Sequence, residues 1–98
     1  MPFVITWFQN EGVEETRARV RPVHLEYLDA NVHRIITSGG LSSDADQPFT
    51  GGMVVVDTDV KQEAIDLIEH DPFFINGIFS RYTINYWKKF IFDHKRLY

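Results

Sequence analysis

The segment TGGMVVVD, residues 50–57, has the clearest strand pattern in the chain. Its four consecutive apolar residues, Met53 to Val56, are too continuous for a strand with one face in water, so we expect it in the centre of a sheet. Residues 42–48 are rich in serine and aspartate and end in proline, which is typical of a turn. Residues 35–41, before that turn, are predicted to form a second, short strand.

A helix is predicted after the central strand. Asp59 and Gln62 have the spacing of a capping box, in which side chains satisfy the first backbone N–H groups of a helix. Pro72 disfavours helical geometry in the residue before it, so this helix should end at Asp71. The apolar residues expected on its inner face are Ala64, Ile65, Leu67 and Ile68.

A longer helix is predicted upstream of the two strands. Apolar residues between positions 16 and 36 recur every three or four residues, which gathers them on one side of a helix. Proline is tolerated in the first turn of a helix but not in its interior, so Pro22 places the start near Arg19 or Val20. The helix should then run to about Arg34.

Two further strands complete the pattern, a mostly buried one at residues 2–9 and one, with alternating sides, at residues 78–87. The order β-α-β-β-α-β matches the ferredoxin-like fold, an α+β class with an antiparallel four-stranded sheet and two helices on one face. Apolar residues also fall on the other face of this sheet. We therefore expect a homodimer in which two sheets pack face to face.

The composition is that of one globular domain over residues 1–98. At 98 residues the chain is long enough for one core and too short for two, and its 44% apolar and 14% aromatic residues are typical of a globular protein. There is no apolar run of about 18 residues and no signal-peptide pattern, so we expect no membrane segment and a cytoplasmic location. Without cysteine, disulfides, thiol nucleophiles and thiolate metal sites are excluded.

Charge is unevenly distributed along the chain. The net charge of −4 is opposite in sign to that expected of a nucleic-acid-binding protein, so we expect no nucleic-acid partner. Residues 88–98 form a basic C-terminal extension that also contains aromatic and aliphatic side chains. This extension is too apolar for a solvated arm, and we expect it to pack on its own domain or on a sister subunit.

His24 is the first candidate for chemistry, because imidazole titrates near neutral pH. It lies on the predicted helix between Val20 and Tyr27, so its ring should point inward. Burial beside a carboxylate would fix its tautomer and tune its basicity, as in a general base. The alternative is a core histidine that is satisfied by one hydrogen bond.

Asp71 is the carboxylate best placed to be such a partner, because Phe73 and Phe74 follow it and indicate partial burial. A carboxylate there could hold the ring of His24. The alternative is that it caps backbone amides or pairs with a cation. The sequence alone does not decide whether the two side chains meet.

No metal or cofactor site is indicated. The chain lacks the HxxxH and HExxH spacings of zinc sites and the GxGxxG and GxxxxGK[ST] loops that bind nucleotides. The glycine pairs at 39–40 and 51–52 are interpreted as turn residues. We therefore expect neither a metal nor a cofactor.

The segments RPVHLEYL at 21–28, SGGL at 38–41 and HDPF at 70–73 together resemble the YCII-related family. The resemblance extends over nearly the whole chain. It implies a dimeric α/β barrel of ferredoxin-like subunits, with a pocket near a paired histidine and aspartate that correspond to His24 and Asp71. The chain differs from the family pattern at Gly40 and Tyr86, where the family often has proline, so substrate choice is not carried over.

The chemistry that the resemblance implies is a lyase that removes HCl from a chlorinated hydroxyhydroquinone without a cofactor. His24 would be the general base and Asp71 would orient it, while the charge of Arg21 would favour a phenolate. Two alternatives stay open, an isomerase similar to muconolactone isomerases and a noncatalytic module that binds a small ligand. The residues expected to form aromatic walls around a small flat substrate are Trp7, Phe73, Phe74 and Tyr82.

Overall fold

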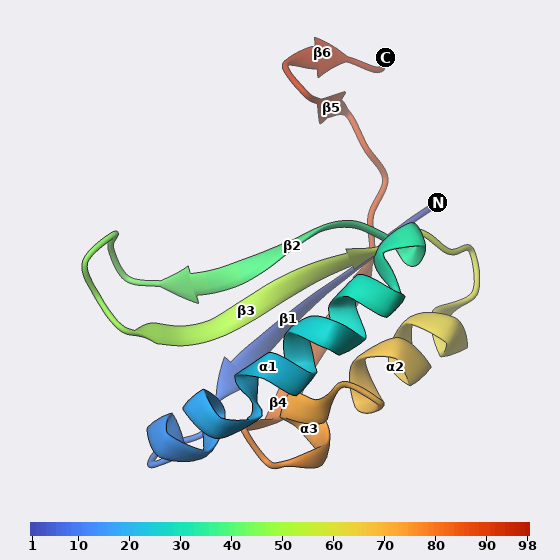
Figure 1. The fold of residues 1–98 in the computed structure, drawn as a ribbon. Helices are drawn as coiled ribbons and strands as arrows, with labels where there is room; N and C mark the ends of the chain where they lie inside the picture. Colours follow the sequence, from blue (N-terminus) through green and yellow to red (C-terminus); the bar gives the residue numbers. More distant parts are fainter.

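An antiparallel sheet of four strands forms the centre of the computed structural model, which describes residues 1–98 (Figure 1). The strands are β1 (Phe3–Gln9), β2 (Ile35–Ser42), β3 (Phe49–Val56) and β4 (Phe79–Tyr86). They follow the spatial order β2-β3-β1-β4. Strand β3 has a neighbour on both sides, which confirms the central position predicted from its apolar run.

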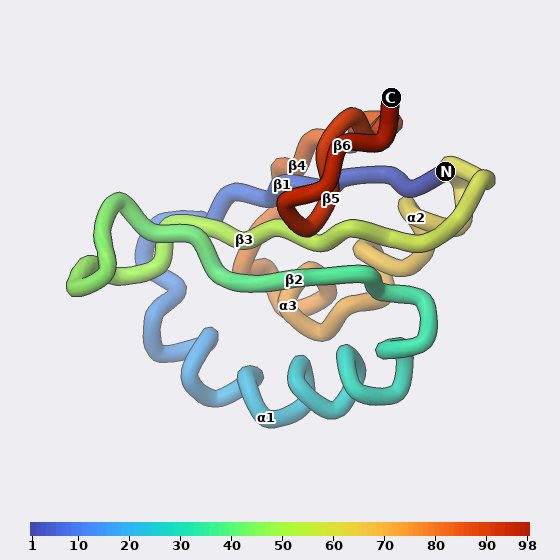
Figure 2. Tube along the Cα trace, turned by 90° about the horizontal axis from the view of Figure 1, so that it is seen from above, coloured from blue at the N-terminus to red at the C-terminus, as the bar shows by residue number.

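The helices lie together on one face of the sheet (Figure 2). They are α1 (Glu14–Ala30), the 3-10 turn η1 (Val32–Arg34), α2 (Lys61–Glu69) and the short α3 (Pro72–Ile75). This layering and the order of the elements confirm the predicted ferredoxin-like α+β class. None of the helices is long and apolar enough to span a lipid bilayer.

The hydrophobic core lies between the sheet and the helices. Alternate residues of β1 and β3 point into it, and Ile5 and Val56 are completely buried. Helix α2 contributes three of its four predicted inner residues, whereas Ile65 is only partly buried. Helix α3 packs against α1, and this contact brings the second half of the chain next to the first helix.

Helix α1 begins earlier than predicted. It starts at Glu14 and contains Pro22 in its interior, so the start near Arg19 is wrong. A proline inside a helix costs about 3 kcal/mol, because it removes one backbone hydrogen bond and crowds the preceding turn. Pro22 and Ala18, whose carbonyl loses its partner, are both exposed, so water can satisfy that carbonyl. The helix ends at Ala30, and the tighter turn η1 replaces its predicted last turn.

The predicted capping box of α2 is also wrong. Asp59 makes an ion pair with the N-terminal amine of Met1 instead of capping the helix. The side chain that orders this helix start is Thr58, whose hydroxyl accepts from the backbone N–H of Val60 (3.0 Å) and donates to the carboxylate of Glu63 (2.6 Å). The N-cap residue is Val60, which makes no side-chain cap hydrogen bond, so the helix begins one residue later than the spacing indicated.

A bulge in β4 changes the face that Phe79 occupies. Gln9 of β1 pairs with Phe79, whereas the preceding β1 residue pairs with Arg81, so β4 has one extra residue there. Phe79 is consequently buried on the helix-covered face, where its ring stacks on Trp7 with the centroids 4.5 Å apart. The strict alternation predicted for residues 78–87 is wrong at this end of the strand.

The outer face of the sheet, opposite the helices, has no helix on it (Figure 2). Strand pairing and alternation assign its residues, and among them only Arg81 is charged. Its guanidinium lies 5.2 Å from the ring of Phe8. The residues of this outer face are Val4, Thr6, Phe8, Thr37, Leu41, Met53, Val55, Arg81, Thr83 and Asn85.

The C-terminal extension leaves the sheet as a separate hairpin of β5 (Ile91–Phe92) and β6 (Lys95–Arg96) (Figure 1). The ring of Phe92 contacts Trp87 with the centroids 6.2 Å apart, but Tyr98 is 75% exposed. Of the two positions predicted for this extension, packing on its own domain is seen in this contact near its base.

Candidate active site

His24 and Asp71 come together in the structure although they lie 47 positions apart in the chain. Helix α1 carries His24, and Asp71 lies between α2 and α3. The imidazole Nδ1 is 2.7 Å from a carboxylate oxygen of Asp71. Both side chains are largely buried, with exposed fractions of 13% for His24 and 5% for Asp71. The contact that the sequence left undecided is therefore a short, buried hydrogen bond.

This hydrogen bond sets the tautomer of the imidazole. An ionised carboxylate can only accept a hydrogen bond, so Nδ1 of His24 carries the proton that is donated to Asp71. In the neutral ring, the proton-accepting lone pair is then on Nε2, which has no hydrogen-bond partner within the chain. The pair thus presents a free basic nitrogen.

Asp71 also begins helix α3. Its side chain accepts a hydrogen bond from the backbone N–H of Phe73 (2.9 Å), and Pro72 occupies the first helical position. The same oxygen, Oδ1, accepts from both the helix and the imidazole. The capping role and the His24-holding role, considered as alternatives from the sequence, are thus combined in one carboxylate.

Phe73 fixes the plane of the imidazole by stacking on its face. Its ring stacks on His24 with centroids 3.7 Å apart and an angle of 3° between the planes. Phe73 is itself buried and makes an edge contact with Trp7 at 6.1 Å. Together with Asp71, this stacking leaves the His24 ring little freedom to rotate.

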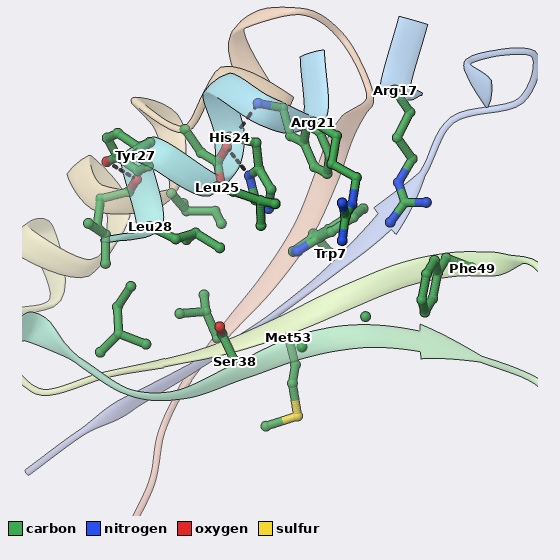
Figure 3. A pocket seen from close by; sticks show the side chains of 18 residues that line it. Trp7, Arg17, Arg21, His24, Leu25, Tyr27, Leu28, Ser38, Phe49 and Met53 are labelled. Atoms are coloured by element: carbon green, nitrogen blue, oxygen red, sulfur yellow. Dashed lines mark hydrogen bonds and ion pairs between the residues drawn. The ribbon is translucent and has the colours of Figure 1, made fainter. Parts of the chain in front are cut away.

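A cavity of about 270 Å³ lies between α1 and the sheet, beside this pair (Figure 3). A cavity of about 150 Å³ is enough to hold benzene, so this one has room for a substituted aromatic ring. Most of the residues around it are apolar. The remaining, polar side chains include His24, Asp71, Arg21 and Arg17.

The expected aromatic walls are only partly correct. Trp7, Phe73 and Arg21 line the cavity with His24, but Phe74 and Tyr82 do not. Phe74 follows Phe73 in a helix, where consecutive side chains point in different directions, and its ring packs on that of Phe79 instead.

Tyr82 lies on β4 and is occupied by a different partner. Its hydroxyl donates to the carboxylate of Glu69 at 2.7 Å. Burial, followed by the hydrogen bond and charge of Glu69, raises the pKa of Tyr82 to about 12. This tyrosine is therefore a neutral hydrogen-bond donor at neutral pH and is directed away from the cavity.

Arg17 is a cavity residue that the sequence analysis missed. Figure 3 shows it on α1 in line with Arg21 and His24. With a helix that begins at Glu14, these positions are i, i+4 and i+7 and share one face. The signal was present in the spacing, but the interpretation of Pro22 as a helix start hid it.

Tyr27 is a second cavity residue that was not singled out for chemistry. Its hydroxyl donates to the backbone carbonyl of Leu67 at 2.6 Å. Burial, and secondly the negative charge of Asp71, raises the pKa of Tyr27, while Arg34 acts in the opposite direction. Tyr27 thus remains neutral and ties α1 to α2 beside the His24–Asp71 pair.

Two glycines expected in turns lie within strands, each against an aromatic ring that lines the cavity. A side chain at Gly52 would be 2.5 Å from the indole of Trp7, and one at Gly40 would be 2.7 Å from the ring of Phe49. Both glycines therefore let an aromatic ring lie against the sheet. The turn interpretation of the pairs 39–40 and 51–52 is wrong, since they belong to β2 and β3.

No group of three or more His, Cys, Asp or Glu side chains is arranged to hold a metal ion. The fold and the site define an α+β domain with a His–Asp pair beside a cavity of aromatic size. The model of the YCII-related domain family matches residues 1–88, so this chain belongs to that family. The resemblance seen in the sequence is confirmed.

A solved structure with the same fold is 5-chloro-2-hydroxyhydroquinone dehydrochlorinase from Burkholderia phenoliruptrix AC1100, in complex with 2,5-dihydroxybenzoquinone. The two chains are 25% identical and superpose with a TM-score of 0.76. The match covers 90% of this chain and 94% of the other. A search of curated proteins finds no significant match.

Proposed function

We propose that this protein is a cofactor-independent lyase that eliminates HCl from a chlorinated hydroxyhydroquinone. The observation that carries the proposal is the buried His24–Asp71 hydrogen bond of 2.7 Å at the wall of a cavity that has room for a substituted aromatic ring. Similarity to a dehydrochlorinase at 25% identity over most of both chains supports this reaction class.

His24 is the general base in this proposal. Its free Nε2 accepts a proton from a substrate hydroxyl, while Nδ1–H stays bonded to Asp71. The imidazolium that results is stabilised by the adjacent carboxylate, because the charges are opposite and both groups are shielded from water. A positioned base of this kind contributes about 100- to 10,000-fold to a rate.

The elimination balances without an added oxidant or cofactor. Loss of one hydroxyl proton to His24 gives a phenolate, which takes up a proton at the ring carbon that bears chlorine and becomes a ketone. Loss of a second hydroxyl proton pushes electrons toward that carbon, and the C–Cl bond breaks. One C–H bond forms, two O–H bonds and one C–Cl bond break, and the products are a hydroxyquinone, chloride and one proton.

The cavity walls suit a flat ring. The ring of Trp7 lies against Gly52 of β3, and the ring of Phe49 lies against Gly40 of β2. Leu25 and Leu28 of α1 also line the cavity. The dihydroxybenzoquinone bound by the solved dehydrochlorinase has the same planar, oxygen-substituted ring as the product of the proposed reaction. This likeness favours a quinone-forming reaction over one on an aliphatic substrate.

The test is a chloride-release assay with 5-chloro-2-hydroxyhydroquinone, in which hydroxyquinone absorbance is followed in parallel. We expect equal amounts of chloride and hydroxyquinone. Conversion without chloride would indicate an isomerase that uses the same base, and binding without conversion would indicate a noncatalytic module. Either outcome would overturn the lyase proposal.

We also propose that the protein is a homodimer through the outer face of the sheet. This face is charged only at Arg81, and apolar side chains such as Val4, Phe8 and Leu41 lie on it. A charge-poor apolar surface of this kind is typical of an interface between subunits. The molar mass in solution, measured by light scattering, tests this proposal.

A further inference from the structure

Arg17 stands in the cavity wall without an acidic partner. The ion pairs of the chain are Met1–Asp59 and His24–Asp71, so no carboxylate lies within 4.0 Å of the Arg17 guanidinium. Arg21, one turn further along α1, also has no ion pair. The cavity is therefore lined by two arginines that form no ion pair within the chain, Arg17, which is half-buried, and Arg21, which is exposed.

The environment of Arg17 makes this arrangement costly. Its Nε atom is buried and has no hydrogen-bond partner. The guanidinium lies 4.7 Å from the ring centroid of Phe49 and 5.5 Å from that of Phe73. Burial, and secondly the charge of Arg21, lowers the pKa of Arg17. A buried donor without an acceptor carries a desolvation cost that a bound acceptor would remove.

Packing alone accounts for only part of this geometry. Attraction to these two aromatic rings explains the position of the guanidinium. They do not supply a hydrogen-bond acceptor for Nε. The side-chain oxygen of Gln9, in an adjoining hollow that Arg17 also lines, is likewise buried without a partner, and a bridging water could serve both atoms. Such a water would leave the positive charge uncompensated.

Phe73 relates Arg17 to the proposed base. One ring contacts both groups, since the imidazole of His24 stacks on Phe73 at 3.7 Å and the guanidinium of Arg17 lies 5.5 Å from the same centroid. A planar guest in the cavity can therefore place one oxygen at His24 and another toward Arg17. Arginine suits the second position, because its planar fork binds ionised oxygens through more than one N–H group.

We propose that Arg17, assisted by Arg21, forms an anion subsite that binds an ionised oxygen of the ring whose hydroxyl group is deprotonated by His24. The choice of a hydroxylated ring rests on the lyase proposal above. The subsite makes the preferred ligand more specific: a ring with an ionised oxygen, such as the hydroxyquinone product, is preferred over its neutral ether. Binding to this subsite is separable from catalysis, so it can be measured without turnover.

The test compares two probes by calorimetry at neutral pH, 2-hydroxy-1,4-benzoquinone, which is ionised, and 2-methoxy-1,4-benzoquinone, which is neutral. The chain has no cysteine, so the quinones meet no thiol. We expect Arg17→Gln to weaken binding of the hydroxyquinone by about 10- to 100-fold, the usual size for a hydrogen bond to a charged group, and to change binding of the methyl ether little. Arg19→Gln, an exposed arginine on the same helix, is the matched control and should change neither.

Three results would overturn the proposal of an anion subsite. They are equal affinity of the wild type for both probes, unchanged affinity of Arg17→Gln for the hydroxyquinone, and an equal loss for both probes, which would assign Arg17 a packing role. Should Arg17→Gln fail to fold, Arg17→Lys can replace it, because it keeps the positive charge but lacks the planar guanidinium. The proposal again requires that this variant lose affinity for the hydroxyquinone and not for the methyl ether. Chloride release distinguishes the proposals: binding without release refutes only the lyase, and release by a wild type without anion preference refutes only the subsite.

Discussion

The two faces of the sheet are both rich in apolar residues but differ in how polar groups are placed among them. On the helix-covered face, the ring of His24 is held by a hydrogen bond to Asp71 and by stacking on Phe73. The outer face has a single charged residue, Arg81, which lies over the ring of Phe8. Apolar alternation alone therefore specifies a surface for packing, whereas a site for chemistry needs polar groups fixed by several contacts each.

The largest effect that would test this comparison is expected from His24→Ala. Turnover should fall by at least about 100-fold, because the general base is lost. Chloride release measures turnover, and circular dichroism checks that the fold is kept. His33→Ala is the matched control, since His33 is exposed and outside the cavity. A folded His24→Ala protein with normal turnover would contradict the proposal that the reaction takes place on the helix-covered face.

Asp71→Asn should have the next largest effect. The amide oxygen still accepts the Phe73 N–H, but the amide cannot stabilise an imidazolium, so turnover should fall by about 10- to 100-fold. Weakening of the cap and of the buried hydrogen bond should lower the free energy of unfolding by about 1 kcal/mol. Chloride release and urea denaturation measure the two effects separately. Lost stability with normal turnover would reduce Asp71 to a helix cap.

A charge at the centre of the outer face should dissociate the dimer while leaving the monomer folded. Thr6 of β1 is only partly buried within one chain and pairs with Met53 and Thr83 of the flanking strands. We expect Thr6→Glu to halve the molar mass measured by light scattering, because burying an unpaired charge between two sheets is unfavourable. Lys61→Glu, an exposed change on α2, should leave the mass unchanged. A wild type that is monomeric at all concentrations would contradict the proposed interface.

The smallest effect is expected from Tyr82→Phe, on the helix-covered side but outside the cavity. The pKa of Tyr82 is raised from 10.0 to about 12, so the folded state holds this proton more tightly than the unfolded state. The resulting stability is complete below about pH 10 and is lost as the pH rises from about 10 to about 12. Tyr82→Phe should make the alkaline loss of stability shallower in urea denaturation, with unchanged chloride release. A fall in turnover would place Tyr82 in the site after all.

The sequence predicted the elements whose periodicity is strong and missed details that depend on contacts between distant segments. The central position of β3 followed from its apolar run, because an uninterrupted run of apolar residues by itself indicates a strand that is buried on both faces. The position of Arg17 at the cavity was hidden because Pro22 suggested a helix start, and only the exposure of that proline shows why the helix continues. The inward position of Phe79 depends on a bulge against β1, which no local pattern encodes.

The single oxygen of Asp71 that serves both α3 and His24 has a consequence for reading other sequences. Selection for a folded protein favours a capping side chain before Pro72, whether or not the protein turns over a substrate, and aspartate is one of the residues that provide it. Its presence in a homologue is therefore no marker of activity. His24 caps no helix, so under the lyase proposal the histidine is the position by which we expect to distinguish active from inactive members when genomes are surveyed.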